Sequence, residues 1–145
     1  MSTISPSPSA PISLESPIST LQKVSELAGR TLLSALFLIA GLGKISAYGA
    51  TVAYMAALGV PSALLPVVIV TEVLGGLAII LGWQTRIIAF LLAGFSLLTA
   101  LIFHNNFADQ IQTMMFLKNV SIAGAFLLLV ANGAGPLSLD RRFSK

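Results

Sequence analysis

Residues 64–81 read LLPVVIVTEVLGGLAIIL, an apolar run that contains a single charged residue, Glu72. A helix of this length spans about 27 Å at a rise of about 1.5 Å per residue, which is close to the roughly 30 Å hydrocarbon core of a bilayer. Pro66 falls in the first turn, where a missing N–H breaks no helical hydrogen bond. The stretch therefore predicts a transmembrane helix that carries a carboxyl group at bilayer depth.

Three further apolar segments lie at residues 27–45, at residues 87–103, and from near Phe116 or Asn119 to Val130 or Ala131. The whole chain is 56% hydrophobic and 9% charged, against about 45–50% and about 25% in an ordinary soluble domain. Its mean hydropathy is +0.94. Because a soluble core cannot absorb this excess, the sequence predicts an all-α membrane protein, a bundle of four transmembrane helices.

The segments between these spans are too short or too polar to cross a bilayer. Residues 46–63 are uncharged, contain Tyr48 and Tyr54, and end in the turn signal Gly59-Val60-Pro61-Ser62. Tyrosine favours the membrane interface, so we expect a short interfacial helix between the first and second spans. Residues 82–86 are expected to form a tight turn. Residues 104–118 are expected to connect the third and fourth spans.

The distribution of charge and of Pro and Ser predicts three regions and an orientation. Residues 1–22 form a Ser/Pro-rich tail that is expected to be disordered and cytoplasmic, 23–140 the membrane domain, and 141–145 a basic cytoplasmic tail. Positive residues favour the cytoplasmic side, so their placement predicts that both termini lie inside the cell. Those assigned to the inner side are Lys23, Arg30, Arg86, Arg141, Arg142 and Lys145, and those assigned to the outer side are Lys44 and Lys118. The net charge of +3 is therefore interpreted as a topology signal, and no nucleic-acid partner is expected.

Glu72 is the most informative residue because an ionisable group at the bilayer centre costs roughly 2.5–3.5 kcal/mol even on a lenient scale. Gly75 and Gly76 follow it by three and four positions and share its helix face. Small residues such as these allow another helix to approach closely. Gly41 and Gly43, at the end of the first span, have the same property. All four glycines are predicted to be helix-packing residues. The carboxyl group is accordingly expected to point into the bundle.

Polar residues from the other three spans are predicted to surround Glu72 in the outer half of the membrane. Lys44 ends the first span, His104 ends the third, and Lys118 and Asn119 open the fourth. Together with Glu72, these residues are the candidate ligand-binding set. The apolar walls of the pocket are expected from residues that share a helix face with Lys44 or His104, namely Phe37, Gly41, Leu97, Ala100 and Leu101.

Each of these residues also has a purely structural interpretation. Lys44 and Lys118 can extend toward the headgroups, His104 can be an interfacial hydrogen-bonding residue, and Glu72 can fix helix register through a buried hydrogen bond. Arg30 is expected to anchor the first span on the cytoplasmic side. The chain has no cysteine and one histidine, so no metal site and no resident redox cofactor are predicted. No catalytic residue is assigned.

Several short motifs resemble the DoxX family of small bacterial inner-membrane proteins, over about residues 26–140. They are Gly41-Leu42-Gly43-Lys44, Gly59-Val60-Pro61, Glu72-Val73-Leu74-Gly75-Gly76, Thr85-Arg86, Phe103-His104, Lys118-Asn119 and residues 135–140, which read GPLSLD. The resemblance implies a multi-pass protein of the bacterial inner membrane. It also implies an accessory subunit of a quinone-linked membrane oxidoreductase, with quinone as a ligand.

Two other functions remain open from the sequence. A non-catalytic scaffold subunit would use its glycine-rich helix faces to assemble a membrane complex, and a small proton-coupled carrier would use the membrane-buried Glu72. The expected partners are the lipid bilayer, a membrane or peripheral redox protein and a second copy of the chain. Electrons would have to come from such a partner because the sequence contains no CxxC motif, no pair of haem-ligating histidines and no glycine-rich nucleotide loop.

Overall fold

The computed structural model describes residues 20–143, and every regular element within them is a helix. Four helices are long and apolar enough to cross a membrane. They are α1 (Thr20–Ser46), α3 (Leu65–Leu81, preceded by the 3-10 helix η1, Ser62–Leu64), α4 (Thr85–Phe103) and α5 (Gln110–Asn132). The two shorter helices are α2 (Tyr48–Ala57) and α6 (Leu139–Phe143). The predicted all-α bundle of four spans is confirmed, and α2 lies where the short helix between the first two spans was expected.

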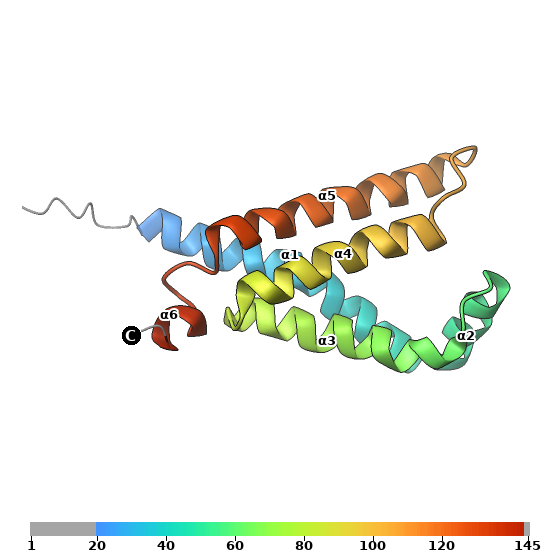
Figure 1. The fold of residues 1–145 in the computed structure, drawn as a ribbon, viewed down its shortest axis with the longest axis horizontal. Helices are drawn as coiled ribbons and strands as arrows, with labels where there is room; N and C mark the ends of the chain where they lie inside the picture. Colours follow the sequence, from blue (N-terminus) through green and yellow to red (C-terminus); the bar gives the residue numbers. More distant parts are fainter. Residues whose placement is uncertain (1–19, 144–145) are drawn as a thin grey trace, which may run out of the picture.

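The four long helices run up, down, up and down along one axis (Figure 1). α1 packs on α3, α4 packs on α5, and the two pairs meet where α3 contacts α4. α2 and η1 lie at one end of the bundle, and α6 and the start of α1 lie at the other (Figure 1). The bundle therefore has two distinct ends, the α2 end and the α6 end.

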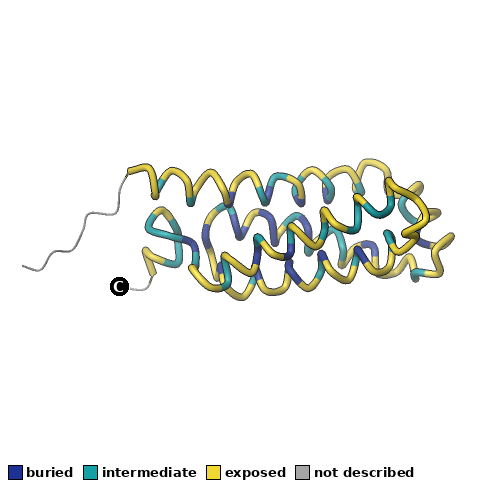
Figure 2. Tube along the Cα trace, turned by 90° about the horizontal axis from the view of Figure 1, so that it is seen from above, coloured by how far each residue is buried: buried dark blue, intermediate teal, exposed yellow. Residues whose placement is uncertain are grey.

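The core of the bundle is small and centres on Phe37 of α1. Its ring contacts Phe126 of α5 edge-on, with centroids 5.3 Å apart, and Phe95 of α4, with centroids 6.4 Å apart. The outer faces of the helices are exposed along their whole length (Figure 2), and they carry apolar residues such as Leu32, which is 75% exposed. A surface of this kind is stable in lipid and not in water, so the bundle is a membrane protein.

The fourth span begins earlier than its apolar run suggests, so the predicted start near Phe116 or Asn119 is wrong. α5 begins at Gln110, and Asp109 caps it by accepting hydrogen bonds from the N–H groups of Ile111 at 2.7 Å and Gln112 at 3.3 Å. An aspartate cap satisfies N–H groups that have no partner in the helix. The amphipathic residues before Phe116 are therefore helical, which an apolar count does not detect.

The helical region also begins before the domain boundary expected from the sequence. α1 starts at Thr20, ahead of Lys23, and α6 continues to Phe143, into the segment assigned to the basic tail. The remainder of the Ser/Pro-rich tail, residues 1–19, and the last two residues lie outside the described residues.

Asp140 of α6 ties the C-terminal segment to the turn between α3 and α4. Its carboxylate accepts the N–H of Gln84 at 2.7 Å and that of Thr85 at 2.9 Å, and its own N–H donates to the carbonyl oxygen of Gly82 at 2.8 Å. Gly82 is left-handed with φ 68°, and a Cβ there would collide with Arg30 and Ser138. The turn therefore requires glycine, and α6 closes its end of the bundle.

Candidate ligand-binding site

Glu72 lies in the middle of α3 and is 5% exposed. Lys44, near the end of α1, donates hydrogen bonds from Nζ to Oε1 at 2.7 Å and to Oε2 at 2.8 Å. The lysine side chain is 27% exposed and the glutamate side chain 7% exposed. A carboxylate inside the span is thus paired with a cation from the neighbouring helix, which offsets the cost of removing either charge from water.

Close helix packing brings the two charges together. A Cβ on Gly41 would lie 2.7 Å from Val73 Cγ2 and 3.2 Å from Glu72 Cβ, so a larger residue there would push α1 away from α3. Gly41 precedes Lys44 by almost one helical turn and lies on the same face. The glycine therefore sets the distance that the lysine side chain must cross.

The other three glycines of the predicted set differ in their surroundings. A Cβ on Gly75 would lie 3.0 Å from Leu92 Cδ2 of α4, and one on Gly76 would lie 3.1 Å from Leu38 Cγ of α1. Both glycines thus lie at helix contacts. Among residues 20–143, a Cβ on Gly43 would have no neighbour within 4 Å, so Gly43 does not lie at a helix contact within this bundle. Two residues turn an α-helix by about 200°, which places Gly43 on the face opposite Gly41.

A cavity of about 360 Å³ lies beside the Lys44–Glu72 pair at the α2 end. Its walls come from α1, α2, η1, α3, α4 and α5, and they are mostly apolar. The lining residues are Leu36, Phe37, Ala40, Lys44, Thr51, Tyr54, Met55, Val60, Leu64, Val68, Glu72, Phe95, Ser96, Leu98, Thr99, Ile102, Phe103, His104, Lys118 and Asn119. All five candidate ligand-binding residues from the sequence therefore line one cavity.

Within this cavity, the candidate residues form two groups. Lys44 and Glu72 bind each other, whereas the other three residues contact residues in the first turns of α5. His104 Nδ1 lies 2.8 Å from Gln112 Oε1, Asn119 Nδ2 donates to the Met115 carbonyl at 3.0 Å, and Lys118 Nζ lies 3.3 Å from Met115 Sδ. In residues 20–143, no hydrogen bond joins this second group to the ion pair. The space between the groups is where a ligand can contact both.

The apolar wall that α4 contributes differs from the one expected. Phe37 lines the cavity, but Gly41, Leu97, Ala100 and Leu101 do not. Leu98, Thr99, Ile102 and Phe103 face it instead. His104 is the C-cap of α4, with φ −134°, so its side chain does not continue the helical period from which its neighbours were predicted.

The sequence reasoning missed the contacts of Tyr54 and Met55, which line the cavity, and of Gln112, which does not line it but binds His104. Tyr54 of α2 stacks on Phe103 of α4, with ring centroids 5.8 Å apart, and Met55 beside it is 3% exposed. Tyr54 was expected to lie among lipid headgroups, yet its ring joins α2 to α4 over the cavity. Gln112, the partner of His104, had no signal because it lies in the part of α5 that the apolar run omits.

Arg30 makes contacts that the sequence did not predict. It is 1% exposed and donates to the carbonyl oxygens of Ile79 at 3.5 Å and Leu137 at 2.5 Å. Its predicted role in anchoring the first span on the cytoplasmic side stays a prediction, but the structure adds that the guanidinium group is buried and satisfies backbone carbonyls inside the α6 end. Such carbonyl partners cannot be identified from a one-dimensional pattern.

The cavity has the polar groups needed to hold an uncharged, hydrogen-bonding molecule. The Lys44 ammonium group donates hydrogen bonds, the Glu72 carboxylate accepts them, and the Asn119 amide can do both. Within residues 20–143, no three His, Asp or Glu side chains gather closely enough to hold a metal ion. The polar side chains that line the cavity support hydrogen bonding and proton exchange.

The bundle and its cavity define a small multi-pass membrane protein with a polar pair inside the lipid-spanning region. The chain belongs to the DoxX family, whose family model matches residues 25–105. This match includes Lys44, Glu72 and His104 and ends before Lys118 and Asn119. The family resemblance found in the sequence motifs is thus confirmed.

Two curated relatives are proteins of Escherichia coli (strain K12). The chain is 52% identical to inner membrane protein YqjF over 89 residues, which are 61% of this chain and 68% of that protein. It is 45% identical to inner membrane protein YphA over 93 residues, which are 59% of this chain and 66% of that protein. No solved structure matches the chain. With four apolar spans and these relatives, the protein is a multi-pass protein of the bacterial inner membrane.

Proposed function

We propose that the cavity at the α2 end binds a quinone headgroup, and that the protein is an accessory subunit of a quinone-linked membrane oxidoreductase. The observation that carries this proposal is the Lys44–Glu72 pair, held at 2.7 and 2.8 Å in the wall of a mostly apolar cavity. Ligand sites commonly combine apolar walls with a few convergent polar groups.

The polar groups of the cavity suit both redox forms of such a ligand. A quinone carbonyl accepts hydrogen bonds, which Lys44 can donate, and a quinol hydroxyl donates them, which Glu72 can accept. The volume of about 360 Å³ lies in the range of about 300–1,000 Å³ that small-molecule sites occupy. The cavity therefore accommodates a single ring with its substituents.

A partner protein would supply or remove the electrons under this proposal, since the chain contains no cysteine for a thiolate-bound cluster or dithiol relay. In the orientation predicted from the positive residues, with both termini in the cytoplasm, the cavity would lie in the outer half of the membrane. The partner would exchange electrons with the bound ring, and Lys44 and Glu72 would hold the ring and its protons.

Equilibrium binding of a short-chain ubiquinone or menaquinone analogue to the protein in lipid nanodiscs tests this function. The informative variant is the double change Lys44→Met with Glu72→Gln, because it removes both charges and leaves neither one buried alone. The matched control is Lys23→Met, which removes a charge from the same helix at the opposite end of the bundle. We expect the double variant to bind at least about tenfold more weakly, a loss of about 1.4 kcal/mol, while its thermal midpoint stays near that of the control.

The alternatives give different results in the same experiment. Wild-type protein that binds neither analogue would overturn the quinone proposal. Loss of the folded state in the double variant would favour a scaffold subunit, in which the pair only fixes the register of α1 on α3. Normal binding and folding together with loss of pH-dependent flux in liposomes would favour a proton-coupled carrier.

A further inference from the structure

A second pocket lies at the α6 end, in the seam between α1 and α5. Its volume is about 320 Å³, and it shares no lining residue with the cavity around Glu72. The pocket is lined by Ser25, Glu26, Gly29, Arg30, Leu33, Ala125, Leu128, Leu129, Asn132, Gly133 and Ala134. α1 packs chiefly on α3 and α5 chiefly on α4, so α1 and α5 meet sparsely, with Phe37 against Phe126 deeper in the bundle.

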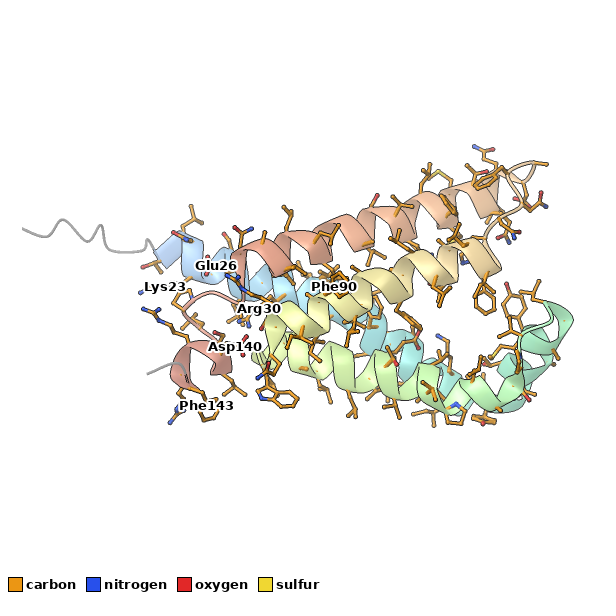
Figure 3. The ribbon with its side chains drawn as sticks, viewed as in Figure 1. Lys23, Glu26, Arg30, Phe90, Asp140 and Phe143 are labelled. Atoms are coloured by element: carbon orange, nitrogen blue, oxygen red, sulfur yellow. The ribbon has the colours of Figure 1, made fainter. Side chains whose placement is uncertain are left out.

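Two side chains of opposite charge form the polar wall of this pocket. Glu26 and Arg30 lie about one helical turn apart on α1 at this end of the bundle (Figure 3). Arg30 Nε and Glu26 Oε2 are both buried and have no hydrogen-bond partner among residues 20–143. A buried polar atom without a partner destabilises the folded state, and a charged one does so more strongly. A bound molecule that supplies an acceptor to Arg30 and a donor to Glu26 would remove this cost.

The pocket is polar at its outer rim and apolar toward the bilayer centre. On α1 the lining passes from Ser25 and Glu26 to Leu33, and on α5 it passes from Asn132 to Leu128. Both helices thus present polar groups near their ends and leucine at greater depth. This gradient of polarity matches an amphiphile whose headgroup lies at the helix ends and whose hydrocarbon chain lies along the seam.

The opposite charges of Glu26 and Arg30 select the kind of headgroup. We propose that this pocket binds a phospholipid whose headgroup carries both a phosphate and a primary ammonium group, the phosphoethanolamine class. Arg30 donates to the phosphate, and Glu26 accepts from the ammonium group. The C-terminal end of α5 lies at the same rim, where the helix dipole also favours a cation.

Two other common headgroups fit these charges less well. A headgroup with a phosphate and no cation offers Glu26 Oε2 at most an uncharged hydroxyl donor, while Gln22 already donates to Glu26 Oε1 at 3.1 Å. A choline headgroup carries a positive charge, but its quaternary nitrogen cannot donate a hydrogen bond. The site therefore discriminates among lipids by hydrogen bonding as well as by charge.

The first test measures lipid binding to the full chain by native mass spectrometry. The purified protein is titrated with dioleoyl phosphatidylethanolamine, phosphatidylcholine and phosphatidylglycerol, in the wild type and in Glu26→Gln. We expect wild-type protein to bind phosphatidylethanolamine about tenfold more tightly than the other two lipids, as one charge-assisted hydrogen bond allows. Glu26→Gln should remove this preference. Equal affinity of wild-type protein for all three lipids, or a preference for either of the other two, would overturn the proposal.

A steric variant keeps the proposal testable if Glu26→Gln does not fold. Gly29 lines the pocket and Gly43 does not, yet both lie on α1 and both are exposed with no atom within 4 Å of a built Cβ. Gly29→Leu should fill the pocket and abolish tight binding of phosphatidylethanolamine, whereas Gly43→Leu should bind it as wild type does. Retained tight binding in Gly29→Leu would contradict the assignment. The quinone assay is independent of this result because the two cavities share no residue.

Discussion

Lys44 Nζ contacts both carboxylate oxygens of Glu72, at 2.7 and 2.8 Å, across the interface between α1 and α3. This bidentate contact involves two of the five candidate ligand-binding residues of the cavity and also links two membrane-spanning helices. Its two roles can be separated because a buried ion pair behaves differently when one partner is removed than when both are.

Removal of one partner alone should destabilise the protein more than removal of both. Lys44→Met leaves the Glu72 carboxylate in a nearly buried position without a cation, and we expect this to cost about 2–4 kcal/mol of the free energy of unfolding. The double variant Lys44→Met with Glu72→Gln should recover at least half of that loss. Unfolding in detergent with increasing dodecyl sulfate measures both values. A double variant less stable than Lys44→Met would show that the pair itself holds α1 on α3.

Gly41 should tolerate a side chain far less well than Gly43. Gly41→Ala places a Cβ 2.7 Å from Val73 Cγ2, and a valine side chain has little freedom to move away. We expect a loss of about 1–3 kcal/mol, the usual cost of overpacking a helix contact. Gly43→Ala, on the opposite face of the same helix turn, is the matched control and should leave stability unchanged within about 0.5 kcal/mol. Equal unfolding midpoints for the two variants would contradict the close approach of α1 and α3.

The sequence predicted most of the fold because membrane-spanning helices have a strong signal in length and apolar content. The second and third spans were placed to within a few residues at both ends, whereas α1 ends within one residue of its predicted end but begins at Thr20, well before Leu27. The tight turn predicted at residues 82–86 is found between Leu81 and Thr85. The start of α5 was missed because its first turns are amphipathic, and the cap that begins them is a single aspartate, Asp109. A count of apolar residues does not detect a helical segment in which about half of the residues are polar.

The sequence predicted several polar residues that line the cavity, but it did not predict which contacts they make. Glu72 stands out because a carboxylate in an apolar run is costly, and Gly75 and Gly76 indicate the face on which it lies. Pairing with Lys44, and not with Lys118, depends on the distance between helix axes, which Gly41 sets. The roles of Arg30 and Tyr54 depend on backbone carbonyls and on a ring of another helix, and neither can be identified from periodicity.

Asp140 should make stability depend on pH in acid. Burial by itself raises the pKa of its carboxyl group, but the hydrogen bonds from Thr85 and Gln84, together with the charge of Arg30, lower the pKa below its usual value of 3.8. A carboxylate with a lowered pKa in the folded state stabilises the protein fully above its unfolded pKa, and this contribution is lost as the pH falls through the folded value. The thermal midpoint should thus fall below about pH 4.

The variant Asp140→Asn isolates this effect. It should lower stability at neutral pH by about 1 kcal/mol, comparable to the loss of a helix cap, because the carboxylate accepts the N–H groups at the start of α4. The difference between the wild type and the variant should shrink as the pH falls below about 4. A difference that stays constant from pH 7 to pH 3 would show that the charge of Asp140 does not contribute.

The cavity should be reached from the outer side of the inner membrane. The chain has no cysteine, so Thr99→Cys introduces a single thiol at the cavity wall, where Thr99 is half-buried. Under the predicted orientation with both termini in the cytoplasm, a membrane-impermeant maleimide should label this thiol in spheroplasts, whose outer face is exposed, and not in inverted vesicles. Ser25→Cys, at the α6 end, is the control and should show the reverse. Labelling of Thr99→Cys only in inverted vesicles would reverse the orientation predicted from the positive residues.

The ring of Tyr54 should limit access to that same wall. Its stacking on Phe103, with centroids 5.8 Å apart and planes at 22°, joins α2 to α4 over the cavity, and aromatic pairs of this kind contribute about 0.5–1.5 kcal/mol. In the Thr99→Cys protein, Tyr54→Ala should therefore increase the maleimide labelling rate by about 2- to 12-fold, the range that corresponds to this energy. Tyr54→Phe keeps the ring and removes only the hydroxyl group, so it should label at the original rate. If Tyr54→Phe labels as fast as Tyr54→Ala, the hydroxyl group and not the stacked ring holds α2 in place.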